Sequence, residues 1–114
     1  EETSSATPNR LVVFSTSHQT TELRATEEGL ELFLHDTRPG QDKGLMWTIP
    51  AENLKDATVS VYDSKEPGLG LFGVGENHYD WYYTKRLFPT QKNLLDAIEN
   101  LKTRSIELSR KKNG

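Results

Sequence analysis

The stretch from residue 68 to residue 75, Gly-Leu-Gly-Leu-Phe-Gly-Val-Gly, has the spacing most suggestive of chemistry. Gly68, Gly70 and Gly73 satisfy G-x-G-x-x-G, with which a strand, a tight turn and a helix bind the pyrophosphate of a dinucleotide. That site needs a helix that begins where the glycines end. Residues 76–84 instead have the pattern of a strand, and only 39 residues follow Gly75. We therefore expect no nucleotide and no other cofactor here.

The four large apolar residues of this stretch are Leu69, Leu71, Phe72 and Val74. One interpretation is a hairpin or bulge whose glycines allow the turn while these side chains fold back into the core. The other is an exposed apolar loop that contacts a protein partner or a membrane surface. The second is our working hypothesis, and it predicts that at least two of the four side chains are largely exposed to solvent.

The segment 79–84 places aromatic residues at alternate positions, which is typical of a strand. Tyr79, Trp81 and Tyr83 would then share one face and pack in the core, whereas Tyr82 would be exposed with Asp80 and Thr84 on the other. Packing in the core explains the cluster most simply. An exposed face would instead form a recognition strip that includes Tyr82.

Lys85 and Arg86 follow the aromatic strand directly, and with Lys65 they could form a small basic site. Guanidinium and ammonium groups bind phosphates and carboxylates through charge-assisted hydrogen bonds. The simpler interpretation is a set of solvated charges. We include Lys85 and Arg86 with Leu69, Leu71, Phe72, Val74 and Tyr82 among the predicted binding residues.

The other reactive residue types form no recognisable catalytic or metal-binding pattern. His18, His35 and His78 are far apart and lack the short spacing of metal ligands, and the chain has no cysteine. No motif such as G-x-S-x-G indicates a nucleophile. We therefore predict no metal site, no catalytic residues and no enzymatic activity.

The length and net charge of the chain further restrict the possible domain organisation and binding partners. The 114 residues suit one domain, and the net charge of −3 argues against nucleic acid as the main partner. No apolar run reaches the roughly 18 residues of a membrane-spanning helix. The sequence begins at Glu1, so we expect a domain of a longer or anchored chain. The compartment stays open, with the cytoplasm as the leading interpretation.

Residues 1–9 are polar without periodicity and predict a disordered tail or linker before a single domain at 10–114. Short alternating runs around 11–14, 23–25, 30–34, 45–49, 59–61 and 79–83 predict six to seven antiparallel strands. Glu28-Gly29 predicts a tight hairpin turn, and 50–54 a short helical turn. After Thr90, a predicted N-cap, apolar residues at spacings of four, three and seven predict an amphipathic helix over about 91–109.

This order of elements resembles the pleckstrin-homology-like (PH-like) superfold, which includes phosphotyrosine-binding and bacterial PH-like domains. The residues that carry the resemblance are Gly29-Leu30-Glu31-Leu32, the segment Trp47-Thr48-Ile49-Pro50-Ala51-Glu52-Asn53-Leu54, and the single closing helix. The resemblance implies an α+β fold, in which a strongly bent antiparallel sheet or open small barrel is closed by the C-terminal helix. An open sheet with a helix across one face is the alternative.

The resemblance also implies a binding or scaffolding role, because PH-like domains bind peptides, lipid headgroups or proteins. We therefore expect a non-catalytic domain that recognises a protein partner or a membrane-associated ligand. A small acidic inhibitor or immunity-type protein is the alternative, since a net negative charge suits a basic target. A third interpretation is a small enzyme or ligand carrier with a site at the mouth of the barrel.

Overall fold

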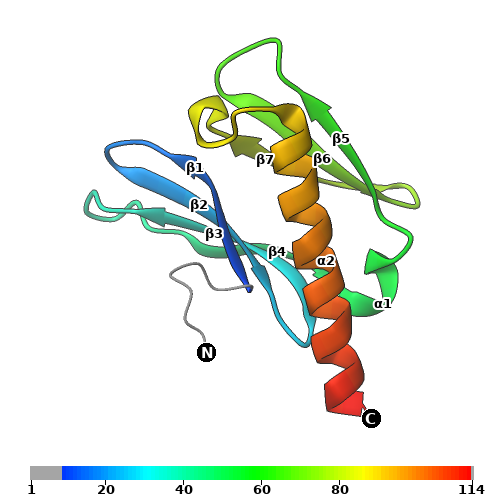
Figure 1. Ribbon diagram of the computed structural model, residues 1–114. Coiled ribbons are helices and arrows are strands. Elements are labelled where there is room, and N and C mark those ends of the chain that lie inside the picture. The colour runs from blue at the N-terminus through cyan, green and yellow to red at the C-terminus, as the bar shows by residue number, and fades with distance from the viewer. Residues whose placement is uncertain (1–8, 114) are drawn as a thin grey trace, which may run out of the picture.

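The computed structural model describes residues 9–113, without the side chain of Asn113, and contains strands, two α-helices and one 3₁₀ turn (Figure 1). In chain order these are β1 (Arg10–Ser15), β2 (Gln19–Ala25), β3 (Gly29–Asp36), β4 (Gly44–Pro50), α1 (Ala51–Leu54), β5 (Thr58–Tyr62), β6 (Gly68–Val74), β7 (Asn77–Tyr83), the 3₁₀ turn η1 (Lys85–Leu87) and α2 (Gln91–Asn113).

The strands form two antiparallel sheets, one in the order β1-β2-β3-β4 and one in the order β5-β6-β7. The expected α+β class, antiparallel pairing and C-terminal helix are confirmed. The expected single bent sheet is corrected to two sheets, and the described residues show no closed barrel. The division falls after Pro50, which pairs with Gly29 as the last residue of β4 and leads directly into α1.

The core lies between the two sheets and α2, which crosses one open side of the pair (Figure 1). Leu23, Leu30 and Phe72 are fully buried in it. The predicted apolar stripe of the helix is also confirmed, because Leu94 and Ile98 are buried against the same cluster. Thr90 caps the helix as predicted, since the Asn93 amide donates to its hydroxyl oxygen at 3.1 Å.

The helix continues to Asn113, beyond the predicted end near Ser109. Contacts with the β2–β3 turn hold the C-terminal half of the helix, including the additional residue Lys112. The Ser105 hydroxyl donates to the Thr26 carbonyl at 2.8 Å, and Lys112 Nζ donates to Glu28 Oε2 at 2.6 Å. The turn itself falls at the predicted position, but its role as a docking point for α2 could not be read from helical periodicity.

The two sheets are joined at one corner by Thr84. Its amide donates to the Val13 carbonyl at 2.8 Å, and its hydroxyl oxygen accepts from the Ser15 amide at 2.9 Å. Thr84 is therefore buried, which corrects the prediction that it is exposed beside Tyr82. The prediction from strand alternation was wrong here because β7 ends at Tyr83, and Thr84 turns towards β1 at the corner where the two sheets meet.

Most of the predicted N-terminal tail, residues 1–8, lies outside the described residues. Asn9, which the sequence assigned to that tail, is bonded to the domain. Its carbonyl accepts from the Ala25 amide at 2.7 Å, and its side-chain oxygen accepts from Arg104 Nε at 2.9 Å. In the part of the chain that the structure describes, neither helix combines the length and apolar character needed to cross a bilayer.

The β3–β4 connection is held by a buried carboxylate. Both Asp36 oxygens accept from the Arg38 guanidinium, at 2.9 and 2.6 Å, and one also accepts from the Arg38 amide at 2.9 Å. These hydrogen bonds hold the pKa of the Asp36 carboxyl well below its ordinary value of 3.8.

We expect Asp36 to contribute to the acid sensitivity of the fold. A carboxyl with a depressed folded-state pKa stabilises fully above the unfolded-state pKa, and this contribution is lost as the pH falls below about 4. In urea unfolding followed by tryptophan fluorescence, Asp36→Asn should therefore lower stability at neutral pH and flatten its decline in acid. Asp96→Asn is the control, because the exposed Lys92–Asp96 pair contributes little. Equal acid slopes for wild type and Asp36→Asn would contradict this prediction.

Candidate functional site

The segment predicted to be an apolar contact loop is instead β6, the central strand of the second sheet. Phe72 is fully buried, Val74 packs against the core, and Leu69 and Leu71 are half-buried on the opposite face. The expectation that at least two of these four side chains are largely exposed is therefore wrong. Strand alternation sorts them, since Phe72 and Val74 point inward and the two leucines point outward.

The glycines of this strand make room for aromatic rings of β7. A Cβ on Gly70 would lie 2.2 Å from Cζ2 of Trp81, and one on Gly68 would lie 2.3 Å from Cζ of Tyr83. Both aromatic residues are directly opposite these glycines in the register. The G-x-G part of the fingerprint thus reflects close packing of rings on a bare strand, and β6 is followed by a turn and another strand rather than by a helix.

The outward face of the second sheet carries two exposed tyrosines on either side of a half-buried leucine. Tyr62 on β5 pairs with Leu69 on β6, which pairs with Tyr82 on β7, so the three lie side by side across the sheet. Tyr62 and Tyr82 are 55% and 56% exposed. We call these three residues the tyrosine row. The next row towards the other end of the sheet contains Ser60, Leu71 and Asp80, which makes the face progressively more polar.

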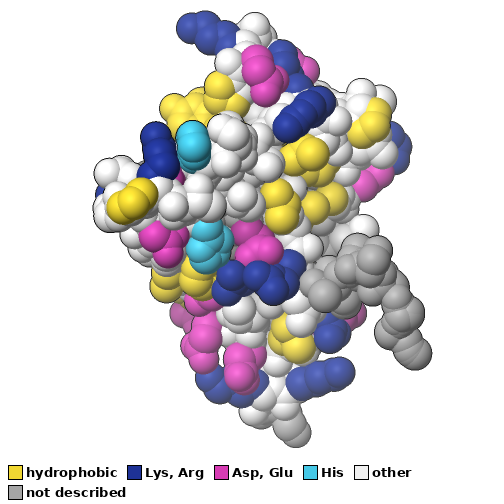
Figure 2. All heavy atoms as spheres, turned by 90° about the vertical axis from the view of Figure 1, so that its left-hand side faces the viewer, with side chains coloured by type: hydrophobic (Ala, Val, Ile, Leu, Met, Phe, Trp, Pro, Cys, Tyr) yellow, Lys and Arg dark blue, Asp and Glu magenta, His cyan; other side chains and the backbone are white. Residues whose placement is uncertain are grey.

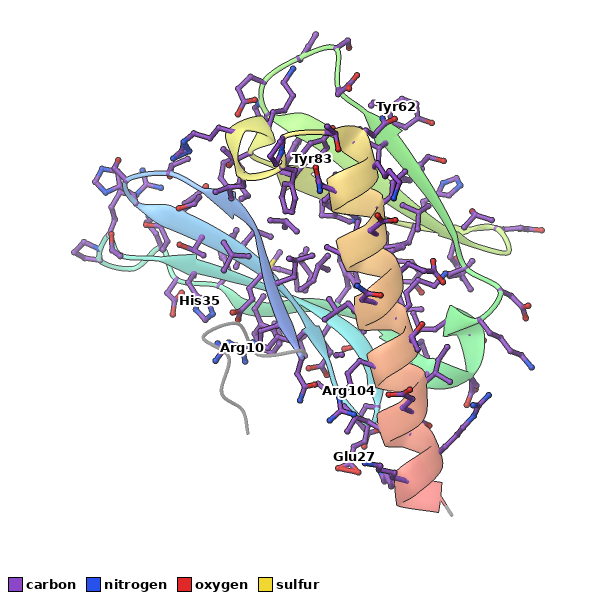
Figure 3. The ribbon with its side chains drawn as sticks, in the orientation of Figure 1. Arg10, Glu27, His35, Tyr62, Tyr83 and Arg104 are labelled. Atoms are coloured by element: carbon purple, nitrogen blue, oxygen red, sulfur yellow. The ribbon has the colours of Figure 1, made fainter. Side chains whose placement is uncertain are left out.

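Sequence reasoning placed Tyr82 on this face and missed Tyr62. The signal was present, because Val59 and Val61 marked a strand, and period-two alternation puts Tyr62 on the face opposite to theirs. Figure 3 shows Tyr62 at the outer margin of the molecule and Tyr83 inside it, beneath the start of α2. The exposed strip that includes Tyr82 is therefore wider than the sequence suggested, because it extends across β5, β6 and β7.

Two of the three predicted basic residues line different hollows of the surface. Lys85 is half-buried, and its Nζ donates to the Asp63 carbonyl at 2.8 Å. Arg86 is exposed and lines a separate open groove of about 560 Å³ with Phe14 and Pro67. Lys65 is exposed in the β5–β6 connection. The structure therefore places Lys85 and Arg86 at different hollows of the surface.

The outer face of the first sheet holds an internally satisfied polar network (Figure 3). Arg10 donates to both oxygens of Glu22, at 3.0 and 2.9 Å, and Arg24 Nε donates to Glu22 Oε1 at 2.6 Å. Burial alone would raise the pKa of Glu22, but these hydrogen bonds outweigh it and lower the pKa. Arg24 also lies 3.9 Å from the centre of the Phe33 ring, which stacks on His35. These contacts give Arg10, Glu22 and Arg24 a structural role on the outer face of the first sheet.

The surface shows mixed charges rather than a field of one sign. Figure 2 shows acidic and basic side chains interspersed over one face of the molecule. A groove of about 400 Å³ between α1, α2 and the β2–β3 turn likewise combines Glu27 and Glu52 with Lys55 and Arg110. Among the residues that the structure describes, no three histidine or carboxylate side chains gather as metal ligands would.

Comparison with known proteins adds no relative. No family model matches the chain, and neither does any curated protein or solved structure.

Proposed function

We propose that this chain is a non-catalytic, PH-like binding domain that recognises a protein partner through the tyrosine row. The exposure of Tyr62 and Tyr82 side by side with Leu69 carries this proposal. The PH-like assignment is supported by the order of elements, with a four-stranded and a three-stranded antiparallel sheet followed by a helix. The resemblance implies binding of peptides, lipid headgroups or proteins.

Tyrosine suits such a surface for physical reasons. Its ring gives a large apolar contact area at a small cost in side-chain entropy, and its hydroxyl can bond at the wet rim of an interface. Tyr is accordingly enriched among the residues that dominate binding energy. The strand beneath the row is held by Phe72, which packs against Trp47 and Trp81 on the inner face. The row is therefore presented on a rigid support.

The chemistry of this face favours a protein over an anionic membrane. The row beside the tyrosine row contains Asp80 and no cation, and the next contains Thr58, Gly73 and His78. A surface that binds anionic lipid headgroups needs a cluster of Lys or Arg. Association with vesicles of phosphatidylserine and phosphatidylcholine would therefore count against the proposal.

The tyrosine row can be tested with peptides selected from a displayed random library against the full chain. Tyr62→Ser combined with Tyr82→Ser should weaken the selected peptides at least about tenfold, as loss of central aromatic contacts does. The free energy of unfolding should change by less than about 1 kcal/mol, because both side chains are exposed.

The matched control is Val12→Ser combined with Leu45→Ser, which removes exposed apolar side chains from the outer face of the first sheet. This control should leave peptide binding unchanged. The proposal fails if the selected peptides bind the tyrosine double variant as tightly as wild type, or if the control variant loses binding instead.

A further inference from the structure

The second sheet ends on one side at β5, which lies at the margin of the molecule (Figure 1). This strand pairs with β6 in an unbroken register, from Thr58 opposite Gly73 to Tyr62 opposite Leu69. Among the described residues, no backbone hydrogen bond reaches β5 from outside its own sheet. An edge strand in this state presents a row of unpaired N–H and C=O groups, onto which another strand can pair.

Two of the other three sheet edges, β1 and β7, are covered by contacts between the sheets. On β1, the Val13 carbonyl and the Ser15 amide both bond to Thr84. On β7, the Asp80 carbonyl accepts from Trp47 Nε1 of the first sheet at 3.2 Å, and the Asp80 side chain adds an exposed charge. Covering contacts and charges of this kind prevent an edge from pairing with another chain.

The remaining edge, β4, is interrupted by its own geometry. Its register with β3 shifts so that Met46 has no partner, which is a β-bulge, and the strand ends at Pro50, which has no N–H to donate. In contrast, β5 contains no charged residue, proline, glycine or bulge. The chain therefore obstructs three of its four sheet edges and leaves β5 open, which indicates that another strand covers this edge.

We propose that β5 pairs antiparallel with β5 of a second copy of the chain, about a twofold axis at Ser60. In this register Val59 lies opposite Val61 of the second copy, and Thr58 lies opposite Tyr62. Pairs of β-branched residues, and of β-branched with aromatic residues, stabilise antiparallel strands. Val59 and Val61 are only half-buried in the single chain although they pack against the core, so the second copy would cover surface that the edge leaves exposed.

The symmetry of the segment favours a second copy over an unrelated strand. The strand Thr-Val-Ser-Val-Tyr has a valine on each side of Ser60. The three residues before it include Lys55 and Asp56, and the three after it include Asp63 and Lys65, all of them exposed. Antiparallel pairing brings the first flank of one copy beside the second flank of the other. Each end of the interface then contains equal numbers of positive and negative charges, so no net charge opposes the pairing.

The proposed interface also closes on itself. A twofold contact uses the same edge of both copies, and the edges that remain free in the dimer are the obstructed ones. Association therefore stops at two chains, and the two second sheets form one continuous sheet. The tyrosine rows of both copies lie on the same face of that sheet. Pairing of the β5 edges does not depend on what the tyrosine row recognises, because it uses the backbone of the strand.

Sedimentation equilibrium of the full chain provides the first test. Over about 1 µM to 1 mM, the average mass should rise from that of one chain to that of two, with a dissociation constant of roughly 10–100 µM, since the interface is small. A chain that stays monomeric at the highest concentration would overturn the proposal. Continued growth beyond two chains would also overturn it, because a twofold contact cannot propagate.

Charge substitutions at Ser60 test the position of the axis. Ser60→Lys and Ser60→Glu should each weaken dimerisation at least about tenfold, because like charges would then lie directly opposite each other. An equimolar mixture of the two variants should dimerise again, because opposite charges then meet. The matched control is Thr48→Lys, at a half-buried hydroxyl residue of the obstructed edge β4, which should dimerise like the wild type. Tight dimers of Ser60→Lys alone, or a mixture that stays monomeric, would contradict the pairing.

Amide hydrogen exchange tests the same edge in the unmodified chain, so the result does not depend on how well a variant folds. Amides of β5 should exchange several-fold more slowly at about 1 mM chain than at about 10 µM, because pairing protects them. Amides of β4 should not change. If the wild type dimerises without protecting β5, or if Tyr82→Ser removes the dimer while Ser60→Lys keeps it, the chains associate through another surface and the proposal is wrong.

Discussion

Replacing Phe72 with Ala is expected to lower the free energy of unfolding by about 3–5 kcal/mol, the range for truncating a buried aromatic side chain. Phe72 is fully buried at the centre of the second sheet. Its ring centre lies 5.9 Å from that of Trp47 on the first sheet and 5.7 Å from that of Trp81 on β7. The substitution removes contacts to both sheets and leaves a cavity that these large rings cannot fill by small movements.

The matched control is the neighbouring residue Leu71, which points to the other face of the same strand. Leu71→Ala should cost less than half as much, because the side chain is only half-buried. Urea unfolding of both variants at neutral pH, followed by circular dichroism, measures the difference. Similar losses for the two would show that β6 does not separate an inner from an outer face in solution.

Gly70→Ala is expected to destabilise the fold by about 3 kcal/mol, the upper part of the range for overpacking a core. The added methyl would lie 2.2 Å from Trp81 Cζ2, far inside contact distance. Trp81 cannot move aside freely, because it is 2% exposed and its ring centre lies 5.7 Å from that of Phe72 and 5.9 Å from that of Tyr83. Alanine is slightly more favourable than glycine in a strand. A loss of stability must therefore come from the clash with the Trp81 ring.

A double-mutant cycle identifies the ring as the cause. In a Trp81→Leu background, Gly70→Ala should cost clearly less than in the wild type, because the ring atoms that the methyl meets are absent. Thermal unfolding of the four proteins gives the coupling energy. If the cost of Gly70→Ala is the same in both backgrounds, the clash does not explain why glycine occupies this position.

Local patterns were sufficient to predict most elements of this fold. The alternation of Leu30, Leu32 and Leu34 marked β3, and the spacing of Leu94, Ile98 and Leu101 marked the buried stripe of α2. Both patterns reflect burial on one face of a regular element, which depends on near neighbours in sequence. The division into two sheets was not predictable in this way, because it depends on which strands pair across Pro50 and α1.

The site was harder to predict because glycine suggested a loop. In β6, Gly68 and Gly70 lie where the rings of Tyr83 and Trp81 cross the strand, so the reason for these two glycines is found more than ten residues away in the sequence. Alternation did identify Tyr82 as exposed, and β-pairing then brought Tyr62 and Leu69 beside it.

Each strand in both sheets pairs with the strand next to it in sequence, and this has a consequence for how the chain folds. Every ladder can form by closing a short loop, so the loss of chain entropy is divided into small steps. The contacts that need distant closure include the Thr84 bonds to Val13 and Ser15, the packing of Trp47 on Phe72, and the docking of α2. Those contacts turn two local meanders into one cooperative unit, and the order in which the chain assembles depends on them.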